Sequence, residues 1–325
     1  MSKWTPADIP SQAGKCAFIT GANSGIGFHA ARHLAGAGCA VILGCRDAKK
    51  GEAARQRIKQ EFPTADVTAA VLDLASLASV RSCAASLLEA GKPLDLLIDN
   101  AGVMAFPTRQ TTADGFERQF GTNHLGHFAL TGLLLPLVLA APAGRVVTVS
   151  SIAHGQGAMR FDDLQYTTGY EGWSVYNQSK LANLLFAFEL QRRLERAGAK
   201  PVSIAVHPGV SMTSIIANGP ANAKDLKSRL LPLVAPLIAQ TDEQGSFPTL
   251  YAATSPMALG GHYYGPDGFM ELKGSPVDVK AKPQALDRAS AARLWSVSED
   301  LTGVRYSALM PLQPDGRTET TLIPA

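Results

Sequence analysis

A tyrosine and a lysine stand four residues apart near the middle of the chain, in the stretch YNQSK (176–180). If this stretch is helical, Tyr176 and Lys180 lie on one face of the helix, where residues i and i+4 are neighbours. A phenol has a pKa of about 10, and an ammonium group beside it stabilises the phenolate and lowers that pKa. Such a pair can transfer a proton, although on its own it is usually only part of a helix surface.

A serine at the end of a predicted strand could complete a site with this pair. The run RVVTVS (145–150) predicts a buried strand, and the second serine, Ser151, follows directly, with Ser150 as the alternative. A hydroxyl at the carboxyl end of a strand can polarise a substrate oxygen. In open α/β sheets the ligand crevice lies at those strand ends. Reducing a carbonyl needs a hydride on carbon and a proton on oxygen, and Tyr176 with Ser151 would act on the oxygen.

A glycine-rich loop, TGANSGIG (20–27), stands between the first predicted strand and the first predicted helix. Glycine lets the backbone approach a pyrophosphate, and free N–H groups at the helix N-terminus face the anion. The spacing is G-x-x-x-G-x-G instead of G-x-G-x-x-G, and a glycine turn without a ligand is the alternative. The loop residues expected to bind a dinucleotide are Gly21, Asn23, Ser24, Gly25, Ile26 and Gly27.

The end of the second predicted strand, VILGCRD (41–47), bears on the choice of dinucleotide. An acidic residue there would bond the ribose 2′-hydroxyl and repel a 2′-phosphate. Cys45 occupies that place, and the guanidinium of Arg46 matches a phosphate with a fork of donors. This favours NADP(H), with NAD(H) still possible. We interpret Asp47 as the N-cap of the next helix and not as a ribose ligand.

Short apolar runs alternate with helical patterns along the chain. They predict strands at 15–20, 39–44, 67–74, 94–99, 145–150 and 202–207. Such strands with crossover helices indicate an α/β fold with a doubly wound, mostly parallel Rossmann sheet of about seven strands and helices on both faces. We predict one domain over 1–270, with a substrate lid at about 211–240, and a C-terminal extension over 271–325 packed on it. In the extension, 271–284 is predicted as loop and 287–301 as helix.

The composition fits a chain with a large core, because 46% of the residues are hydrophobic and 18% are charged. The formal charge of +3 and the lack of a basic tract argue against a nucleic-acid partner. The four cysteines form no C-x-x-C pair, so we expect neither a disulfide framework nor a metal site. We see no signal peptide and no transmembrane segment, because the apolar stretch at 230–239 is too short, and we expect a cytoplasmic protein.

Five motifs together resemble the short-chain dehydrogenase/reductase family over about residues 14–270: TGANSGIG, NAG (100–102), VSS (149–151), YNQSK and HPG (207–209). Their order and rough spacing match those of the family. Within the family, CRDAKKGE, TNHLGHFALT and QSKLANLLFAFEL look like the retinol dehydrogenase and WW-domain oxidoreductase-like branch. The resemblance to that branch implies a preference for NADP(H). Two departures stand out: Asp99-Asn100 replaces the usual pair of asparagines, and the gap from Ser151 to Tyr176 is longer than in core members.

The resemblance implies a catalytic set of Ser151, Tyr176, Lys180 and Asn123, in which Asn123 anchors a water relay to Lys180. Further cofactor contacts are expected after the strands. They are Asp73 and Leu74, then Asn100, Ala101 and Gly102, then Tyr176 and Lys180, and finally Pro208, Gly209, Val210 and Thr213. In particular, Asp73 could bond the adenine amino group and Val210 could offer backbone groups to the carboxamide. The remaining histidines near these motifs, at 124, 127, 154 and 207, are interpreted as packing residues.

These features predict an NADP(H)-dependent oxidoreductase that transfers a hydride between nicotinamide and an apolar carbonyl or alcohol substrate. One alternative is a dinucleotide-binding regulatory protein that senses NADP(H) without turnover, although such family members usually lose the tyrosine or the lysine. Another is an epimerase or dehydratase of the same fold, for which no additional acid or base is seen near Tyr176. The apolar helix predicted at 180–194 could also pair with its copy, which leaves a homodimer or homotetramer open.

Overall fold

A computed structural model describes residues 3–210 and 240–309 of the 325-residue chain. Almost all of the predicted lid, including Thr213, lies outside the described residues, and so does the end of the predicted extension from residue 310.

In the described part of the chain, eight strands form one sheet in the order β3-β2-β1-β4-β5-β6-β7-β8. Neighbouring strands from β3 to β7 run parallel, and β8 pairs antiparallel with β7. The strand bounds are β1 (Cys16–Thr20), β2 (Ala40–Cys45), β3 (Val67–Val71), β4 (Leu96–Asp99), β5 (Arg145–Val149), β6 (Val202–Val206), β7 (Tyr263–Pro266) and β8 (Pro276–Asp278). The direction of winding changes between β1 and β4, which is where such sheets bind ligands. The predicted doubly wound fold is confirmed.

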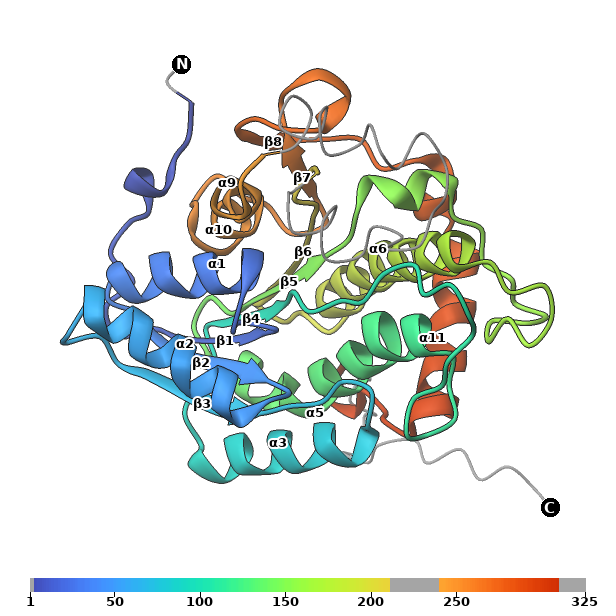
Figure 1. Cartoon of the computed structure of the whole chain (residues 1–325), viewed down its shortest axis with the longest axis horizontal. Coiled ribbons are helices and arrows are strands. Elements are labelled where there is room, and N and C mark those ends of the chain that lie inside the picture. Colours follow the sequence, from blue (N-terminus) through green and yellow to red (C-terminus); the bar gives the residue numbers. More distant parts are fainter. Residues whose placement is uncertain (1–2, 211–239, 310–325) are drawn as a thin grey trace.

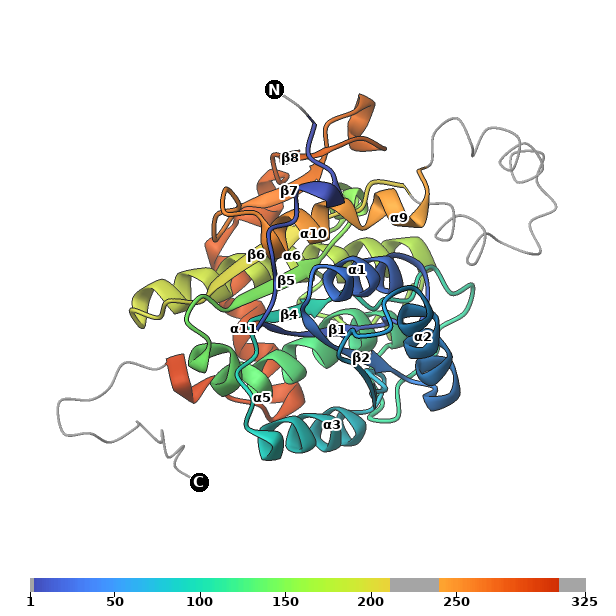
Figure 2. The ribbon, with the colours of Figure 1, turned by 90° about the vertical axis from the view of Figure 1, so that its left-hand side faces the viewer.

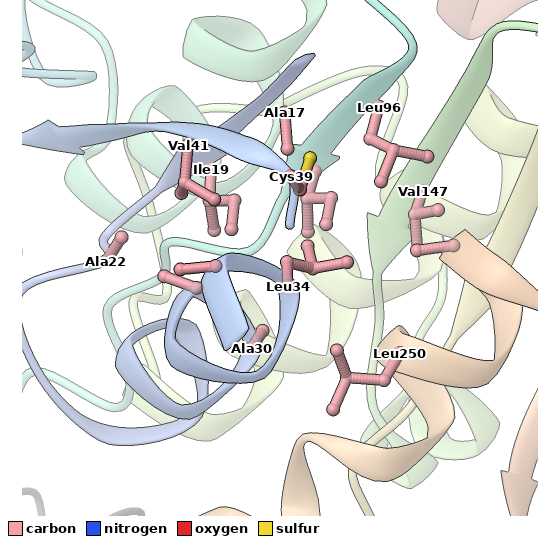
Figure 3. Packing of buried hydrophobic residues seen from close by; sticks show 14 of the residues in the cluster. Ala17, Ile19, Ala22, Ala30, Leu34, Cys39, Val41, Leu96, Val147 and Leu250 are labelled. Atoms are coloured by element: carbon pink, nitrogen blue, oxygen red, sulfur yellow. The ribbon is translucent and has the colours of Figure 1, made fainter. Parts of the chain in front are cut away.

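Helices cover both faces of the sheet (Figures 1 and 2). One face carries α1 (Gly25–Gly36), α2 (Ala48–Glu61), α9 (Asp242–Gly245) and α10 (Phe247–Thr254), and the other carries α3 (Leu77–Ala90), α5 (Gly126–Ala140), α6 (Gly172–Arg196) and α11 (Arg288–Thr302). Figure 3 shows the first layer from close by, with Leu34 of α1 and Leu250 of α10 directed towards the strands. Both side chains are fully buried. Because α1 packs on the sheet directly after β1, its N-terminus lies close to the carboxyl end of β1.

Local sequence explains where the helices begin and end. The Asp47 carboxylate accepts the N–H groups of Lys49 and Lys50, which caps α2 as predicted. Ser76 caps α3 in the same way, and Gly91 ends it in the left-handed conformation. The helix predicted at 287–301 is confirmed as α11, which begins after an Asp287 cap.

Two predicted elements differ from the structure. The strand predicted at 67–74 ends at Val71, because the Asp73 carboxylate accepts the Ala75 N–H and turns the chain towards α3. The segment 271–284, predicted as loop, contains β8. A hairpin brings β8 beside β7, and it is closed by the Asp267 carboxylate, which accepts the Ser275 N–H. The boundary predicted at residue 270 therefore falls within this hairpin.

One long apolar helical segment crosses the core. It runs from Arg118 to Ala140 through α4 (Arg118–Phe120), the π-helical turn η2 (Gly121–Leu125) and α5. Among the described residues it alone combines the length and hydropathy needed to cross a bilayer, with a mean hydropathy of 1.3. In its apolar 18-residue window 67% is buried inside the protein, so packing against the sheet and against α3 accounts for its apolar composition.

Candidate active site

Tyr176 and Ser151 meet at the carboxyl ends of the central strands. Ser151 follows β5 and caps the 3₁₀ turn η3 (Ile152–Gln156), where its hydroxyl accepts the Ala153 N–H. Tyr176 lies in α6, and the Ser151 side chain lies close enough to its phenol to lower the phenol pKa. Ser150 is different, because its hydroxyl is buried and donates to the carbonyl of Lys180 at 2.7 Å. Of the two serines, Ser151 is thus the one that faces the phenol.

Lys180 lies one turn after Tyr176 on the same helix face. Its Nζ is 5.9 Å from the centroid of the tyrosine ring and donates to the carbonyl of Val149 at 3.1 Å. Burial lowers the pKa of this ammonium to about 8. The side chains come together as the i, i+4 spacing predicts.

The expected lowering of the tyrosine pKa is not seen. Burial raises the pKa of the Tyr176 phenol above its ordinary value of 10.0, and only the nearby Ser151 side chain opposes this rise. The reason is that Lys180 is itself desolvated and directs its ammonium at a main-chain carbonyl. A phenol that keeps its proton is suited to donate it to a substrate oxygen.

Asn123 lies in the π-helical turn η2, a feature that is frequent at functional sites. Its amide oxygen accepts the Val103 N–H at 2.8 Å, and its amide nitrogen donates to the Val103 carbonyl and to the Ser179 hydroxyl. Gly102 leaves room beside it, because a Cβ on that glycine would lie 3.4 Å from both Asn123 Oδ1 and Lys180 Nζ. The side chains of Asn123 and Lys180 therefore face the same glycine.

The glycine loop has the geometry of an anion site. Gly21 and Gly25 have positive φ angles of 67° and 58°, which favour glycine. A Cβ on Gly27 would lie 2.5 Å from the amide nitrogen of Asn100 and 2.6 Å from the carbonyl of Gly21, so only glycine fits. The side chain of Ser24 does not cap α1, which leaves the first N–H groups of α1 available to a phosphate. These residues fit a bound pyrophosphate.

Arg46 is exposed at the end of β2, and its guanidinium has no hydrogen bond or ion pair with any described residue. The neighbouring Asp47 carboxylate is already used at the N-terminus of α2. Cys45 is buried, and burial raises the pKa of its thiol to about 11, so it offers no negative charge. Among the described residues, the charged side chain that this strand end leaves without a partner is therefore the cation Arg46.

The residues that follow β3 and β4 shape the same edge of the sheet. One carboxylate oxygen of Asp73 is taken by Ala75, which leaves the other for a ligand, and Leu74 is buried. Asn100 donates its side-chain amide to the carbonyl of Thr20 at 2.8 Å and thereby ties the end of β4 to the end of β1. Ala101 donates its N–H to the Thr20 hydroxyl at 2.9 Å.

After β6, Gly209 has a φ of 66° and Pro208 accepts a hydrogen bond from the Gln240 side chain. Val210 departs from the expectation. Its N–H donates to the Leu272 carbonyl and its carbonyl accepts the Gln240 N–H, both at 2.9 Å. In this arrangement the N–H is used within the protein and is not available to a carboxamide, because the β7–β8 hairpin packs on this segment.

The comparisons with known proteins agree with this site. The model of the short chain dehydrogenase family matches residues 15–223, a range that holds the glycine loop, Ser151, Tyr176 and Lys180. The chain belongs to this family.

Among the relatives of this short-chain dehydrogenase, human retinol dehydrogenase 13 is 41% identical and mouse polyprenol dehydrogenase is 39% identical. Both alignments cover 92% of the chain, with 89% and 87% of the respective relative. A crystal structure of an uncharacterized protein from Mycobacterium paratuberculosis matches with a TM-score of 0.77 and 40% identity, over 94% of this chain and 99% of that one. The chain is thus a member of the retinol dehydrogenase branch.

A solved structure titled as the RhlG/NADP active-site complex of Pseudomonas aeruginosa is also similar, with 26% identity and a TM-score of 0.62. It covers 81% of this chain and 98% of that chain.

Two residues near the site, Thr20 and His127, were given no role in the site from the sequence. The Thr20 hydroxyl accepts the N–H groups of Asn100 and Ala101 and donates to His127 Nε2 at 2.8 Å. His127 Nδ1–H in turn donates to the carbonyl of Asn123 at 2.9 Å. Burial lowers the pKa of His127 to about 4, so the ring is neutral. In the sequence, only the placement of Thr20 at a strand end and of the histidine four residues after Asn123 hints at this link.

None of the histidines, cysteines or acidic residues that the structure describes form a group of three or more with the spacing of a metal site.

Proposed function

We propose that this short-chain dehydrogenase transfers a hydride between NADP(H) and an apolar carbonyl or alcohol, with reduction as the direction its site favours. The observation that carries the proposal is that the Tyr176 phenol lies beside the Ser151 side chain. Lys180 is one helical turn from Tyr176, and the glycine loop lies at the same ends of the strands. These are the groups that a carbonyl oxygen needs for polarisation and protonation.

The nicotinamide, when bound, supplies the hydride, and the residues of the chain supply the rest. The N–H groups at the start of α1 hold the pyrophosphate. Ser151 donates a hydrogen bond to the substrate oxygen, and Tyr176 passes its proton to that oxygen. Lys180 lies beside the phenol ring and faces Gly102 together with Asn123, and we propose that these two residues help to return a proton to the phenol.

The test is oxidation of NADPH and of NADH by the purified protein in the presence of benzaldehyde, octanal, retinal and a steroid ketone. We expect turnover with NADPH and at least one of these carbonyls. Tight binding of NADPH without any turnover would instead favour a protein that only senses the dinucleotide.

The preference for NADP(H) is proposed from the free guanidinium of Arg46 and the occupied carboxylate of Asp47. The similar solved structure of the RhlG/NADP active-site complex supports the same choice. Charge-assisted bonds to a phosphate are each worth about 1.5–3 kcal/mol, so losing the arginine and adding a repelling charge is expected to cost about a hundredfold in affinity.

We therefore expect Arg46→Asp to raise the KM for NADPH about a hundredfold and to leave the KM for NADH nearly unchanged. Steady-state kinetics with both dinucleotides measure this. Lys92→Asp is the matched control, because it makes the same charge change at an exposed residue before β4, at the opposite end of the strands. Unchanged selectivity in Arg46→Asp would contradict the assignment of the phosphate site.

The exposed indole of Trp173, beside the proposed proton donor, is one reason why we propose an apolar substrate. Its side chain is 50% exposed, and its ring stands edge-on to the ring of Tyr176 with 5.9 Å between the centroids. The two residues are three apart on one face of α6, so the indole flanks the approach to the phenol. Apolar side chains that are covered by a ligand contribute about 1.5–3 kcal/mol.

We expect Trp173→Ala to raise the KM for the carbonyl substrate about tenfold or more, with kcat and the KM for NADPH nearly unchanged. Trp173→Phe should keep most of the affinity, because it keeps an aromatic surface. Kinetics with octanal and benzaldehyde at saturating NADPH measure the effect. Equal KM values in wild type and Trp173→Ala would exclude the indole from the substrate site.

A further inference from the structure

A buried histidine lies directly behind the serine of the site. His154 is 3% exposed and belongs to the turn η3 that Ser151 begins. Its Nδ1 is 2.7 Å from the carbonyl oxygen of Ser151. A carbonyl can only accept a hydrogen bond, so Nδ1 carries the proton. The main-chain N–H of His154 donates to the same oxygen at 3.1 Å. Two donors of one residue therefore hold the Ser151 carbonyl.

The other ring nitrogen of His154 accepts a hydrogen bond from a residue that is distant in the sequence. His154 Nε2 accepts the main-chain N–H of Lys282 at 3.2 Å, across 128 residues. An N–H can only donate, so Nε2 has no proton. Each nitrogen thus has one partner of fixed role, and the ring is held as the neutral Nδ1–H tautomer. A protonated ring would set two donors against each other at Lys282.

The segment that holds the histidine also holds the rest of its turn. The side-chain amide of Gln284 donates to the carbonyl of Gly155 at 2.9 Å, and at longer distances to those of His154 and Gly157. The turn packs on α6 on its other side, where a Cβ on Gly157 would lie 2.6 Å from the carbonyl of Asn177. The ring of Tyr263 stands edge-on to His154 with 5.5 Å between centroids, and its hydroxyl is 3.4 Å from the Ser151 carbonyl.

We propose that His154 is a positioning residue for the proposed reaction: its neutral Nδ1–H tautomer, held by the Lys282 N–H, fixes the main chain of Ser151 and so aims the serine hydroxyl at the substrate oxygen. This inference rests on the proposed function for its kinetic consequence, though not for the tautomer itself. It also gives the segment after β8 a role in the site, because Lys282 and Gln284 belong to it. A displacement of about 1 Å in such a group can cost about a hundredfold in rate.

The sharpest variant removes only the donor that holds the histidine. Lys282 has a φ of −70°, which proline adopts without strain, so Lys282→Pro deletes the N–H at a backbone angle that suits proline. Lys282→Ala loses the same side chain and keeps the N–H, and it is the matched control. We expect kcat for the fastest carbonyl of the panel to fall about tenfold in Lys282→Pro and to stay near wild type in Lys282→Ala, with NADPH affinity unchanged in both.

Substitutions of the histidine separate the two bonds. His154→Phe keeps a ring and loses both bonds, and it should lower kcat about 10- to 100-fold. His154→Asn places an amide donor near the position of Nδ1 and should restore most of kcat, whereas His154→Gln lacks a donor at that position and should not. A merely space-filling role would rank these variants by their thermal midpoints instead, with phenylalanine as the least damaging.

A spectroscopic readout is independent of turnover. In ¹⁵N-labelled protein, the imidazole signals that disappear in His154→Asn identify the residue, and we expect them to show a protonated Nδ1 and an unprotonated Nε2. An Nε2–H tautomer would overturn the proposal, and so would wild-type kcat in both Lys282→Pro and His154→Phe. Full turnover in Tyr176→Phe would contradict the proposed function. The tautomer seen in the ¹⁵N spectrum would still show whether His154 makes the two hydrogen bonds described above.

Discussion

Tyr176→Phe is expected to lower kcat for carbonyl reduction by about a thousandfold or more. The substitution removes the hydroxyl that contacts Ser151 and leaves the ring that packs against Trp173. General acid catalysis by a positioned side chain contributes about 10²–10⁴-fold. Among the described residues, the other protic side chains that contact Ser151 are those of His154 and Tyr263, and both contact its main-chain oxygen. NADPH consumption measures the loss, and fluorescence titration should show unchanged NADPH binding.

Tyr170→Phe is the control for this result. Tyr170 is the other phenol near the start of α6, and its hydroxyl donates to the carbonyl of Phe106 at 3.2 Å. This variant also loses one phenol oxygen, yet it should keep kcat within a few fold. Comparable losses in the two variants would show that Tyr176 is not the specific proton donor.

Asp99→Asn is expected to stabilise the protein at neutral and alkaline pH by a few kcal/mol. Asp99 ends β4 with 1% exposure, and one of its oxygens accepts the Thr131 hydroxyl at 2.9 Å. The other oxygen has no hydrogen-bond partner. Burial raises the pKa of this carboxyl from 3.8 to about 8. One pKa unit corresponds to about 1.4 kcal/mol, so the cost of keeping this acid buried is substantial.

The sign of the pH dependence follows from the two states. Below 3.8, Asp99 is protonated in both the folded and the unfolded chain and costs nothing. As the pH rises, the unfolded chain releases this proton while the folded chain keeps it until about 8, so the free energy of unfolding falls over that interval. An asparagine does not titrate, and its amide oxygen can still accept the Thr131 hydroxyl.

Thermal unfolding from about pH 5 to about pH 9 measures this effect. The midpoint of Asp99→Asn should exceed that of the wild type by a margin that grows with pH up to about 8. Asp66→Asn, at an exposed aspartate before β3, controls for the loss of one formal charge. A constant difference between Asp99→Asn and wild type across the pH range would mean that Asp99 does not carry a buried proton.

The motifs predicted the location of the site because each follows a strand of a parallel sheet. The carboxyl ends of such strands share one edge of the sheet. Their convergence can therefore be predicted without knowledge of the packing, and it brings together residues 20–27, 46, 100–102 and 151. The contact of Lys180 with Tyr176 is equally local, since one helix sets it. The N-cap role of Asp47 was also predictable, because it depends only on Lys49 and Lys50, two and three residues later in the same helix.

The predictions that were wrong or incomplete depended on distant residues. The strand β8 forms because a hairpin brings it to β7, although its sequence contains a proline and looks like loop. The N–H of Val210 is taken by Leu272, which that same hairpin supplies. The pKa of Tyr176 rises because residues outside its own helix partly bury the phenol, and spacing within one helix does not report desolvation.

By itself, the sequence determined the sheet, the family and the identity of the residues at the strand ends, because these follow from local periodicity and from glycine, serine and tyrosine at defined spacings. The tertiary structure alone decided which of two adjacent serines faces the phenol, that Asp99 is a buried acid, and that His154 is held between Ser151 and Lys282. The physical reason is that burial and hydrogen-bond partners are set by contacts between residues far apart in the chain, and such contacts leave no periodic signal in the sequence.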